Sequence, residues 1–449
     1  MSFVHNVTVQ PMAGKKNLIF LSRRLYETWK LSSDVAFTIA CGGKQQQVYC
    51  MPQNEEGQLT CDPSLIQEFH LPTEPLSLRL RYDPEAGSFE IGPIIAVLTY
   101  IKNNTFEGPL AGFCEEMARY SEKQHAVFYV LTLKDWRRHS VVGYHWQHGR
   151  WNRRELPQPN VVHNRIGQRK LEQLTATGQF YQSLTEKQIP YFNARFLDKW
   201  EVHEKLATHP ELMPYLPETV LYEGKASLES MLKRHAFVFL KPAIGSQGKR
   251  IFRIHRLEDY FELDYTTFTS DLGRRFSTFD DLYVTLESRL HRQPFIIQQG
   301  LSLIEHKGHP LDFRMLCNKG KNGNWEMTSA IARVSNEEQF VSNLAQGGAS
   351  YPVRKVLADT FQDQTARQIR FLLNELALEA ANVISLETEG IYGELGIDLA
   401  LDRQGKPWII EVNTKPSKDL DPEREPSVIR PSAKAVIDYC CFLSGFAKT

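Results

Sequence analysis

Residues Gly393–Pro416 read GELGIDLALDRQGKPWIIEVNTKP, and their pattern predicts a β-hairpin. From Ile397 to Leu401, apolar residues alternate with Asp or Ala, which is typical of a strand with one buried face. The segment Asp402–Lys406 contains Asp, Gly and Lys and is typical of a turn. We expect a second strand at Trp408–Val412.

The end of this hairpin carries candidate metal ligands. Side chains alternate faces along a strand, so Glu411 and Asn413 point the same way, and Asp398 can join them if the strands pair across the turn. Two carboxylates and one amide oxygen suit a hard cation such as magnesium, which would hold a nucleotide phosphate. An ordinary amphipathic hairpin with acidic residues on its solvent face is the alternative that this stretch leaves open.

Composition limits the class of protein. The chain has 449 residues, which suits two or three domains. Lys and Arg number 53, as do Asp and Glu, so no net charge favours nucleic acid or an anionic membrane as a partner. No apolar run is long enough to span a bilayer, and the N-terminus has no signal-peptide pattern. The odd number of cysteines, 7 without a CxxC pair, argues against a disulfide framework or a zinc site and indicates a reducing compartment.

The first half of the chain predicts two regions. Ile91–Tyr100 is a continuous apolar run typical of a buried strand, Leu110–Gln124 has a helical stripe, and Ala126–Leu133 is a further buried strand. These three elements form a βαβ unit with a parallel sheet, but without the GxGxxG fingerprint of a dinucleotide site. The region before them is predicted to be β-rich, with strand candidates at Leu18–Leu21, Val35–Ala40, Gln47–Met51 and Leu76–Tyr82.

A lysine and a glycine loop interrupt Phe237–Ile254, FVFLKPAIGSQGKRIFRI. An apolar strand leads to Lys241, and the loop contains Gly245, Ser246 and Gly248, whose backbone can approach phosphates. The order strand, Lys, glycine loop, strand matches neither a Walker A loop nor a protein kinase. A glycine-rich hairpin turn with an exposed lysine is the alternative.

Further polar residues follow on strands. Pro294–Gln299 is a strand that ends in two glutamines, and Trp325–Arg333 is another that ends in Arg333. Asp312 and Arg314 share a strand face, where they belong to a site or form an exposed ion pair. The polar stretch 334–348, which ends in Gly347-Gly348, is long for a connection and is interpreted as a lid, with a surface loop as the alternative.

In chain order these pieces resemble the ATP-grasp superfamily. The step from Asp398 to Glu411 resembles the D-alanine–D-alanine ligase branch, and SNLAQGG resembles the glutathione synthetase and ribosomal-protein glutamate ligase branches. More closely, the chain resembles the YheC/YheD family, endospore coat-associated proteins of spore-forming bacilli. The motifs that carry this likeness are IGPIIAVLTY, DKWEVHEKL, LKPAIGSQGKRIFRI, DFRML, ELGIDLALD and IIEVNTKPS.

The resemblance implies a role for each matching residue. Lys199 and Lys241 would touch the nucleotide phosphates, Arg314 and Arg333 would face the transferred phosphate and the substrate carboxylate, and Asp398, Glu411 and Asn413 would bind magnesium. The remaining residues implied to bind ATP form the loop over the phosphates, the adenine-reading hinge and the lid, and are Gly245, Ser246, Gln247, Gly248, Gln298, Gln299, Gly300, Leu301 and Asn343.

The implied fold is α/β with mixed elements. It comprises a β-rich N-terminal domain at residues 1–87, a pre-ATP-grasp domain at 88–190 and an ATP-grasp domain at 191–449. One departure stands out: where D-alanine ligases place an arginine two residues before the first metal aspartate, this chain has Gly396. This difference argues against a substrate of the D-alanine type.

The implied activity is ATP- and magnesium-dependent ligation of a carboxylate to an amine through an acyl phosphate. The carboxylate, an amino acid, peptide or polypeptide, is not identified by the sequence. The resemblance also implies a place in the cytoplasm of the mother cell or at the spore coat, with coat proteins as partners. A nucleotide-binding coat protein without turnover and an ATP-dependent kinase are the alternatives.

Overall fold

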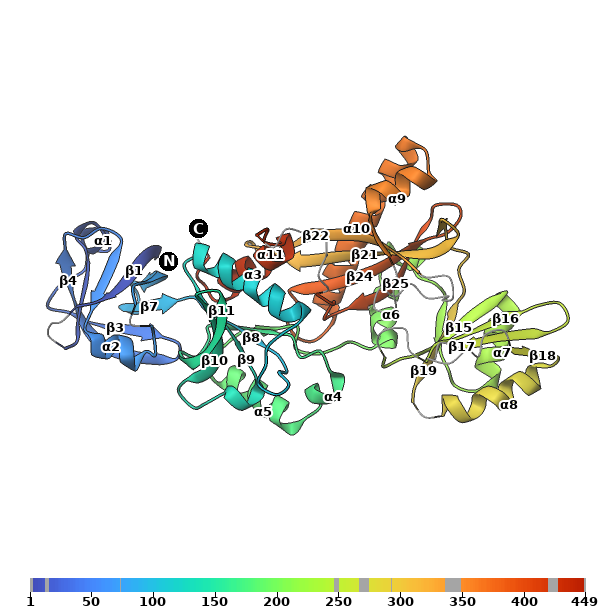
Figure 1. Ribbon diagram of the computed structural model, residues 1–449, viewed down its shortest axis with the longest axis horizontal. Coiled ribbons are helices and arrows are strands. Elements are labelled where there is room, and N and C mark those ends of the chain that lie inside the picture. The colour runs from blue at the N-terminus through green and yellow to red at the C-terminus, as the bar shows by residue number, and fades with distance from the viewer. Residues whose placement is uncertain are drawn as a thin grey trace.

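We describe the protein from a computed structural model, which covers residues 3–12, 16–72, 74–245, 250–265, 274–291, 293–335, 349–418 and 427–447. Figure 1 shows a closed barrel at one end, an α/β domain beside it, a central antiparallel sheet and a lobe at the other end. No described helix is both long and apolar enough to cross a membrane.

The N-terminal region forms a closed β-barrel in which the strands follow the order β1-β5-β2-β4-β3-β7-β6. The four strand candidates of this region are confirmed as β2, β3, β4 and β6, while β1, β5 and β7 had no clear sequence signal. The elements are β1 (Phe3–Pro11), β2 (Leu18–Ser22), α1 (Arg23–Thr28), β3 (Ala36–Cys41), β4 (Lys44–Gln53), β5 (Gln58–Cys61), α2 (Pro63–Glu68), β6 (Leu76–Asp83) and β7 (Ser88–Gly92).

Six strands of the barrel belong to two similar units, β1-β2-α1-β3 and β4-β5-α2-β6, and β7 pairs with β3 and β6 between them. The side chains of Ser22 and Asp62 cap the two helices, and Lys30 and His70 follow them with φ of 51° and 53°. The first strand of each unit pairs only with strands of the other unit: β1 with β5 and β6, and β4 with β2 and β3. Neither unit can therefore form its sheet alone.

The α/β domain contains a sheet of order β11-β10-β9-β8-β12-β13, and β8, β9, β12 and β13 run parallel. The predicted βαβ unit is confirmed, but Ile91–Tyr100 is not one strand. Pro93 has no N–H to donate, and the chain passes here from the barrel to the second sheet. The elements are β8 (Ile94–Leu98), α3 (Pro109–Lys123), β9 (Val127–Leu131), β10 (Val141–Gln147), β11 (Arg150–Leu156), β12 (Val161–Asn164), α4 (Arg169–Glu172), α5 (Thr175–Glu186) and β13 (Tyr191–Phe192).

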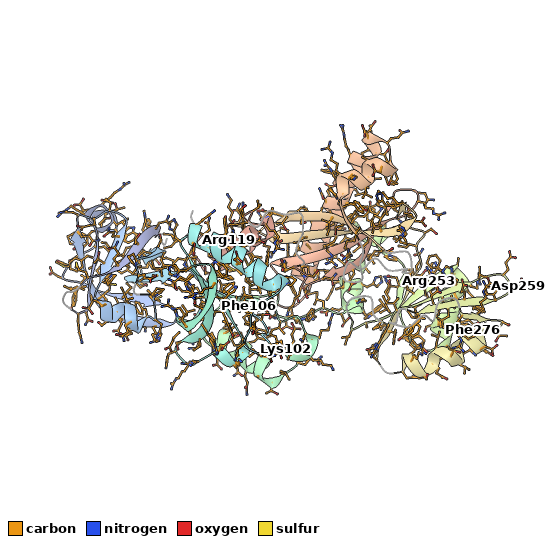
Figure 2. All side chains as sticks on the ribbon, viewed as in Figure 1. Lys102, Phe106, Arg119, Arg253, Asp259 and Phe276 are labelled. Carbon is orange, nitrogen blue, oxygen red and sulfur yellow. The ribbon has the colours of Figure 1, made fainter. Side chains whose placement is uncertain are left out.

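The lobe is a sheet of order β14-β19-β15-β16-β17-β18 with α7 and α8 packed on one face. Arg253, labelled in Figure 2, lies on the opposite face and donates from Nε to Asp264 at 2.8 Å. That face therefore carries polar groups. The elements are β14 (Thr219–Leu221), α7 (Lys225–Arg234), β15 (Phe237–Pro242), β16 (Phe252–Arg256), β17 (Phe261–Tyr265), β18 (Arg274–Phe276), α8 (Phe279–Leu290) and β19 (Phe295–Gln299).

The central sheet has the order β23-β22-β21-β24-β25, with β20 beside β21. The amphipathic helix α10 packs on β21, β22 and β24, and α11 packs on α3. The predicted hairpin is confirmed as β24 and β25. The elements are α6 (Lys199–Ala207), β20 (Glu305–His306), β21 (His309–Lys319), β22 (Trp325–Val334), β23 (Ala349–Pro352), α9 (Val353–Thr360), α10 (Asp363–Glu387), β24 (Glu394–Leu401), β25 (Pro407–Asn413) and α11 (Pro431–Leu443).

The hydrophobic cores do not correspond to single sheets, because one core is shared by two of them. One cluster runs from barrel residues such as Ile39 and Leu80 into Ala96 and Leu184 of the α/β domain. The C-terminus adds to this joint, because Phe446 is fully buried and its carbonyl accepts from Arg79 Nη1 at 2.5 Å. The lobe, in contrast, has a core of its own.

We expect the barrel and the α/β domain to unfold together and the lobe to unfold separately. Ile39→Ala removes buried volume from the shared core and should lower the free energy of unfolding by about 2–5 kcal/mol. Native-state hydrogen exchange should then increase in both the barrel and the α/β domain. The matched change Ile254→Ala, in the core of the lobe, should increase exchange in the lobe alone. Exchange that rises only in the barrel after Ile39→Ala would contradict a shared core.

Candidate functional site

The candidate metal ligands of the hairpin share one face because a β-bulge interrupts the pairing of β24 and β25. Asp398 lies opposite Glu411, but the next pair is Leu399 opposite Ile409, so Ile410 is the extra residue. Ile409 and Val412 are both buried in the core. Strict alternation from Ile409 would have turned Glu411 into the core as well. The bulge instead leaves Glu411 on the face that carries Asp398.

Asp398 is buried, with 4% of its surface exposed, and is surrounded by positive charge. Arg314, its cross-strand neighbour on β21, donates from Nε to one carboxylate oxygen and from Nη2 to the other at 2.8 Å. Arg333 Nη2 lies 3.1 Å and Asn413 Nδ2 lies 3.2 Å from Asp398 Oδ2. Burial raises the pKa of Asp398, but the two guanidinium groups outweigh it and hold the pKa below its ordinary value. Asp398 is therefore an ionised carboxylate.

Arg333 is also held by a second carboxylate, Asp312. Arg333 Nε donates to Asp312 Oδ1 at 2.6 Å and Nη2 donates to Oδ2 at 2.5 Å, and the two residues are cross-strand partners on β21 and β22. The idea that Asp312 and Arg314 form an exposed ion pair is wrong. Asp312 pairs with Arg333 on β22, whereas Arg314 pairs with Asp398 on β24. The side chains of Arg314 and Arg333 are only 16% and 11% exposed.

Lys199 connects the hairpin to the lobe. Its Nζ lies 3.2 Å from Glu411 Oε1 and donates to the carbonyl of Gly245 at 3.1 Å. Asp198 caps the N-terminus of α6, so Lys199 is the first residue of that helix. The N–H of Lys199 donates to the carbonyl of Ala243 at 3.0 Å, which ties the start of α6 to the end of β15.

Lys241 stands at the end of β15 and completes the cluster. Its Nζ donates to Gln298 Oε1 at 2.5 Å, and Gln298 Nε2 donates to Thr219 Oγ1 at 3.1 Å. Burial lowers the pKa of Lys241 to about 8, while the nearby Glu411 carboxylate opposes this shift and Lys199 adds to it. Lys241 is thus within electrostatic reach of both groups of the Lys199–Glu411 pair.

The expected hinge, Gln298–Leu301, leaves the lobe with part of its backbone already bonded. The N–H of Gln299 donates to the carbonyl of Glu218 at 2.8 Å, and the N–H of Gly300 donates to that of Phe237 at 3.0 Å. An adenine ring at this segment would therefore meet the carbonyl groups or the backbone of Leu301.

Gly396 lies beneath the Arg314 side chain. A Cβ built on Gly396 would lie 3.0 Å from Pro416 Cβ and 3.3 Å from Arg314 Cδ, which is tighter than ordinary contact. A side chain at this position would have to displace one of these neighbours. Arg314 therefore takes the space before Asp398 that a larger residue would fill.

Several expected site residues fall outside the described part of the chain. They are Ser246, Gln247 and Gly248 of the glycine loop and Asn343, together with most of the stretch interpreted as a lid, residues 336–348.

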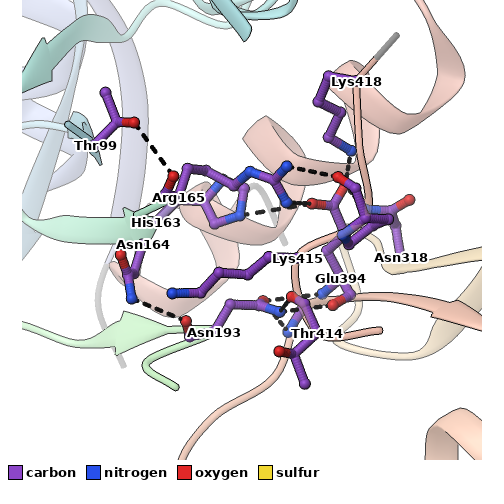
Figure 3. A network of polar contacts seen from close by, with 12 residues as sticks. Thr99, His163, Asn164, Arg165, Asn193, Asn318, Glu394, Thr414, Lys415 and Lys418 are labelled. Atoms are coloured by element: carbon purple, nitrogen blue, oxygen red, sulfur yellow. Dashed lines mark hydrogen bonds and ion pairs between the residues drawn. The ribbon is translucent and has the colours of Figure 1, made fainter. Parts of the chain in front are cut away.

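Sequence reasoning missed a buried polar network that joins the α/β domain to the hairpin (Figure 3). Glu394, the fully buried first residue of β24, accepts from Arg165 Nη1 at 2.7 Å and from Lys418 Nζ. Burial raises the pKa of Glu394, but Lys418 and Arg165 outweigh it and lower the pKa to about 2. Lys415 donates to Glu172 and to the carbonyl of Ile166 at 3.1 Å. The charged partners are distant in sequence, so no local sequence pattern predicts their contacts.

The chemistry of the oxygen donors fits a divalent cation. Asp398, Glu411 and Asn413 lie together, and cationic side chains now neutralise both carboxylates. In the part of the chain that the structure describes, no cluster of three or more His, Cys, Asp or Glu side chains could hold a metal ion. A metal at this hairpin would therefore rely on two carboxylates, the amide of Asn413 and ligands from the substrate.

Comparison with known proteins identifies a family. Residues 188–443 match the family model described as YheC/D like ATP-grasp. The chain is 29% identical over 343 residues to the endospore coat-associated protein YheD of Bacillus subtilis (strain 168), which covers 74% of each chain. It is 24% identical over 279 residues to the endospore coat-associated protein YheC of the same strain, covering 61% of this chain and 75% of that one.

Solved structures show more distant similarity. D-alanyl-alanine synthetase A from Vibrio cholerae O1 biovar eltor str. N16961 has a TM-score of 0.47 and 15% identity, covering 79% of this chain and 99% of its own.

We expect the affinity for ATP to fall as the pH rises through about 8, because Lys241 then loses its positive charge. Below this pH a protonated Lys241 would attract a phosphate, and above it the binding of ATP would have to take up a proton. Calorimetry in buffers of different ionisation enthalpy measures both effects. Lys241→Arg stays protonated and should remove the pH dependence. Proton uptake that persists unchanged in Lys241→Arg would mean that another group is responsible.

Proposed function

Because the chain belongs to the YheC/D-like ATP-grasp family, we propose that it is an ATP- and magnesium-dependent carboxylate–amine ligase that acts through an acyl phosphate. The observation that carries the proposal is the convergence of Lys199 and Lys241 with Asp398, Glu411 and Asn413. Fixed cations beside hard oxygen ligands are what a nucleoside triphosphate with a divalent cation requires.

The charges of the cluster support an anionic ligand. Each carboxylate already has a cationic partner, and Lys241 bonds to the neutral Gln298 instead. The cluster thus has an excess of positive charge before any metal binds. Its cations are Lys199, Lys241, Arg314 and Arg333, and its anions are Asp312, Asp398 and Glu411.

Asp398, Glu411 and Asn413 would hold magnesium. The ion would neutralise phosphate oxygens and polarise the γ-phosphoryl group when bound there. Lys199, at the start of α6, and Lys241, on β15 of the lobe, would hold the oxygens of the same phosphates. Arg314 and Arg333, fixed by Asp398 and Asp312, would orient the substrate carboxylate toward the γ-phosphorus.

The reaction then proceeds in two displacements. A carboxylate oxygen of the substrate bonds to the γ-phosphorus while the bond to the β-phosphate oxygen breaks, so ADP leaves and an acyl phosphate forms. An amine nitrogen next attacks the acyl carbon, phosphate departs with the bonding electron pair, and the amine loses a proton. Positioning and charge stabilisation carry such transfers, so no nucleophilic side chain is needed.

The substrate in our proposal is an amino acid, a peptide or a polypeptide side chain. The packing of Arg314 over Gly396 supports an acid that is not of the D-alanine type, because the site lacks room for an additional arginine there. The named relatives are endospore coat-associated. We extend that association to this chain, in the mother-cell cytoplasm or at the coat, with coat proteins as partners. The seven cysteines are buried free thiols, which is compatible with a reducing compartment.

Glu411→Ala should weaken the magnesium-dependent part of ATP binding by roughly ten-fold or more, or about 1–2 kcal/mol. ATP binding without magnesium should be unchanged or stronger, because Lys199 loses its carboxylate partner. Calorimetry with magnesium and with a chelator separates the two effects. Glu375→Ala, an exposed glutamate on α10, is the matched control and should behave as wild type. If Glu411→Ala and wild type bind ATP with equal affinity in the presence of magnesium, Glu411 is not a magnesium ligand.

Hydroxylamine should trap the acyl phosphate as a hydroxamate when the protein, magnesium and ATP meet the right acid. Lys241→Ala should abolish the trapped product, because the developing phosphate charge loses a fixed cation. The measurement is mass spectrometry over a broad panel of amino acids, peptides and coat polypeptides.

Lys233→Ala provides the control, since Lys233 is an exposed lysine of the same lobe that pairs with Glu229. A stable phosphorylated alcohol without any hydroxamate would show that the protein is a kinase and not a ligase. ATP binding without any product across the panel would favour a coat protein that has lost turnover.

A further inference from the structure

Asn193 is the residue at which the α/β domain meets the end of the hairpin. It follows β13, the last strand of that domain, and is fully buried. Its φ of 56° lies in the left-handed region, which asparagine tolerates better than most residues. Its backbone N–H donates to the carbonyl of Ile391 at 2.8 Å, and its carbonyl accepts from Asn164 Nδ2 at 3.1 Å. Asn193 is therefore fixed from both sides.

The two strands of the hairpin separate next to this residue. Their ladder ends at the pair Gly396 and Asn413. Beyond that pair, Glu394 on β24 and Thr414 after β25 no longer face each other as ladder partners. Backbone groups at such a fork are buried and need other partners.

The amide of Asn193 supplies these partners. Its Oδ1 accepts from the N–H groups of Gly393 at 3.1 Å and Glu394 at 3.2 Å. Its Nδ2 donates to the carbonyls of Glu394 at 2.6 Å and Thr414 at 2.5 Å. A carboxamide has the same acceptor and donor groups as a peptide unit, and here both hydrogens and both lone pairs are used. The side chain thus continues the ladder where β25 leaves it.

We propose that Asn193 is a positioning residue for the metal-binding end of the hairpin. Thr414 directly follows Asn413, so the bond to its carbonyl fixes the point at which Asn413 leaves the strand. Asn413 in turn contacts Asp398 at 3.2 Å. Through these bonds the α/β domain holds Asn413 next to Asp398, and both would then serve as ligands of the magnesium ion. The role in metal binding rests on the function proposed above.

Asparagine meets both demands of this position, the positive φ and the four hydrogen bonds. Glycine accepts the positive φ but has no amide, and aspartate keeps the shape but cannot donate to the two carbonyls. Both substitutions therefore keep the backbone conformation and remove hydrogen bonds: glycine removes all four, and aspartate removes the two that Nδ2 donates.

The test compares Asn193→Gly and Asn193→Asp with wild type. Calorimetry should show that ATP binding in the presence of magnesium weakens roughly ten-fold or more in both variants, while binding in the presence of a chelator changes by less than about two-fold. Asn160→Gly is the matched control. Asn160 also bonds a backbone N–H, that of Ile94, at 2.8 Å, but it lies before β12 and so at the far end of the sheet from Asn193. This variant should retain wild-type magnesium dependence even if its melting temperature falls.

Hydrogen exchange without any ligand provides a readout that does not depend on the proposed function. Both Asn193 variants should exchange faster at 412–416 and at 393–395, with the lobe unchanged. Wild-type exchange at these segments in Asn193→Asp would overturn the proposal, as would wild-type magnesium dependence in either folded variant. If wild type itself shows no magnesium-dependent binding, the proposed function fails, and the exchange data alone decide whether Asn193 holds the fork.

Discussion

The bulge at Ile410 is the constraint on which the site depends. A strand presents alternate residues to opposite faces, so a slip of one residue would move every side chain to the wrong side. Here the slip occurs once, between Ile409 and Glu411, and turns only the end of β25. The apolar part of the strand remains in the core, and the carboxylate avoids burial without a partner, which would be costly. Asp398 on β24 needs no such device, because its strand keeps one register with β21.

The buried ions around Glu394 act on orientation more than on stability. Removing one partner of a buried pair typically costs about 3–5 kcal/mol, yet replacing the whole pair by apolar residues is often neutral. Apolar residues would not fix the orientation of the two parts as directional hydrogen bonds do. Arg165 donates to both Glu394 and the carbonyl of Pro416, which lie on different arms of the hairpin. The α/β domain is thereby held in one arrangement relative to the hairpin.

Local patterns predicted the elements well and their long-range relations poorly. Alternating residues predicted the hairpin, and the helical stripe at Leu110–Gln124 predicted α3. The bulge was missed because Ile410 is as suitable for a regular strand as its neighbours. The family resemblance, and no local pattern, pointed to Arg314 and Arg333, which both contact Asp398. The pairing of Arg333 with Asp312 depends on strand register that no local signal gives. The barrel was seen only as isolated strands, because its closure joins residues far apart in the chain.

The pairing of strands between the two units of the barrel has a consequence for synthesis of the chain. β1 pairs with β6 from Phe3 opposite Tyr82 to Val9 opposite Leu76, so the first strand waits for its partner until both units have left the ribosome. Contacts between distant residues form slowly. During that interval β1 presents unpaired N–H and C=O groups to any other nascent chain. β1 therefore needs protection from other chains until β6 is available for pairing.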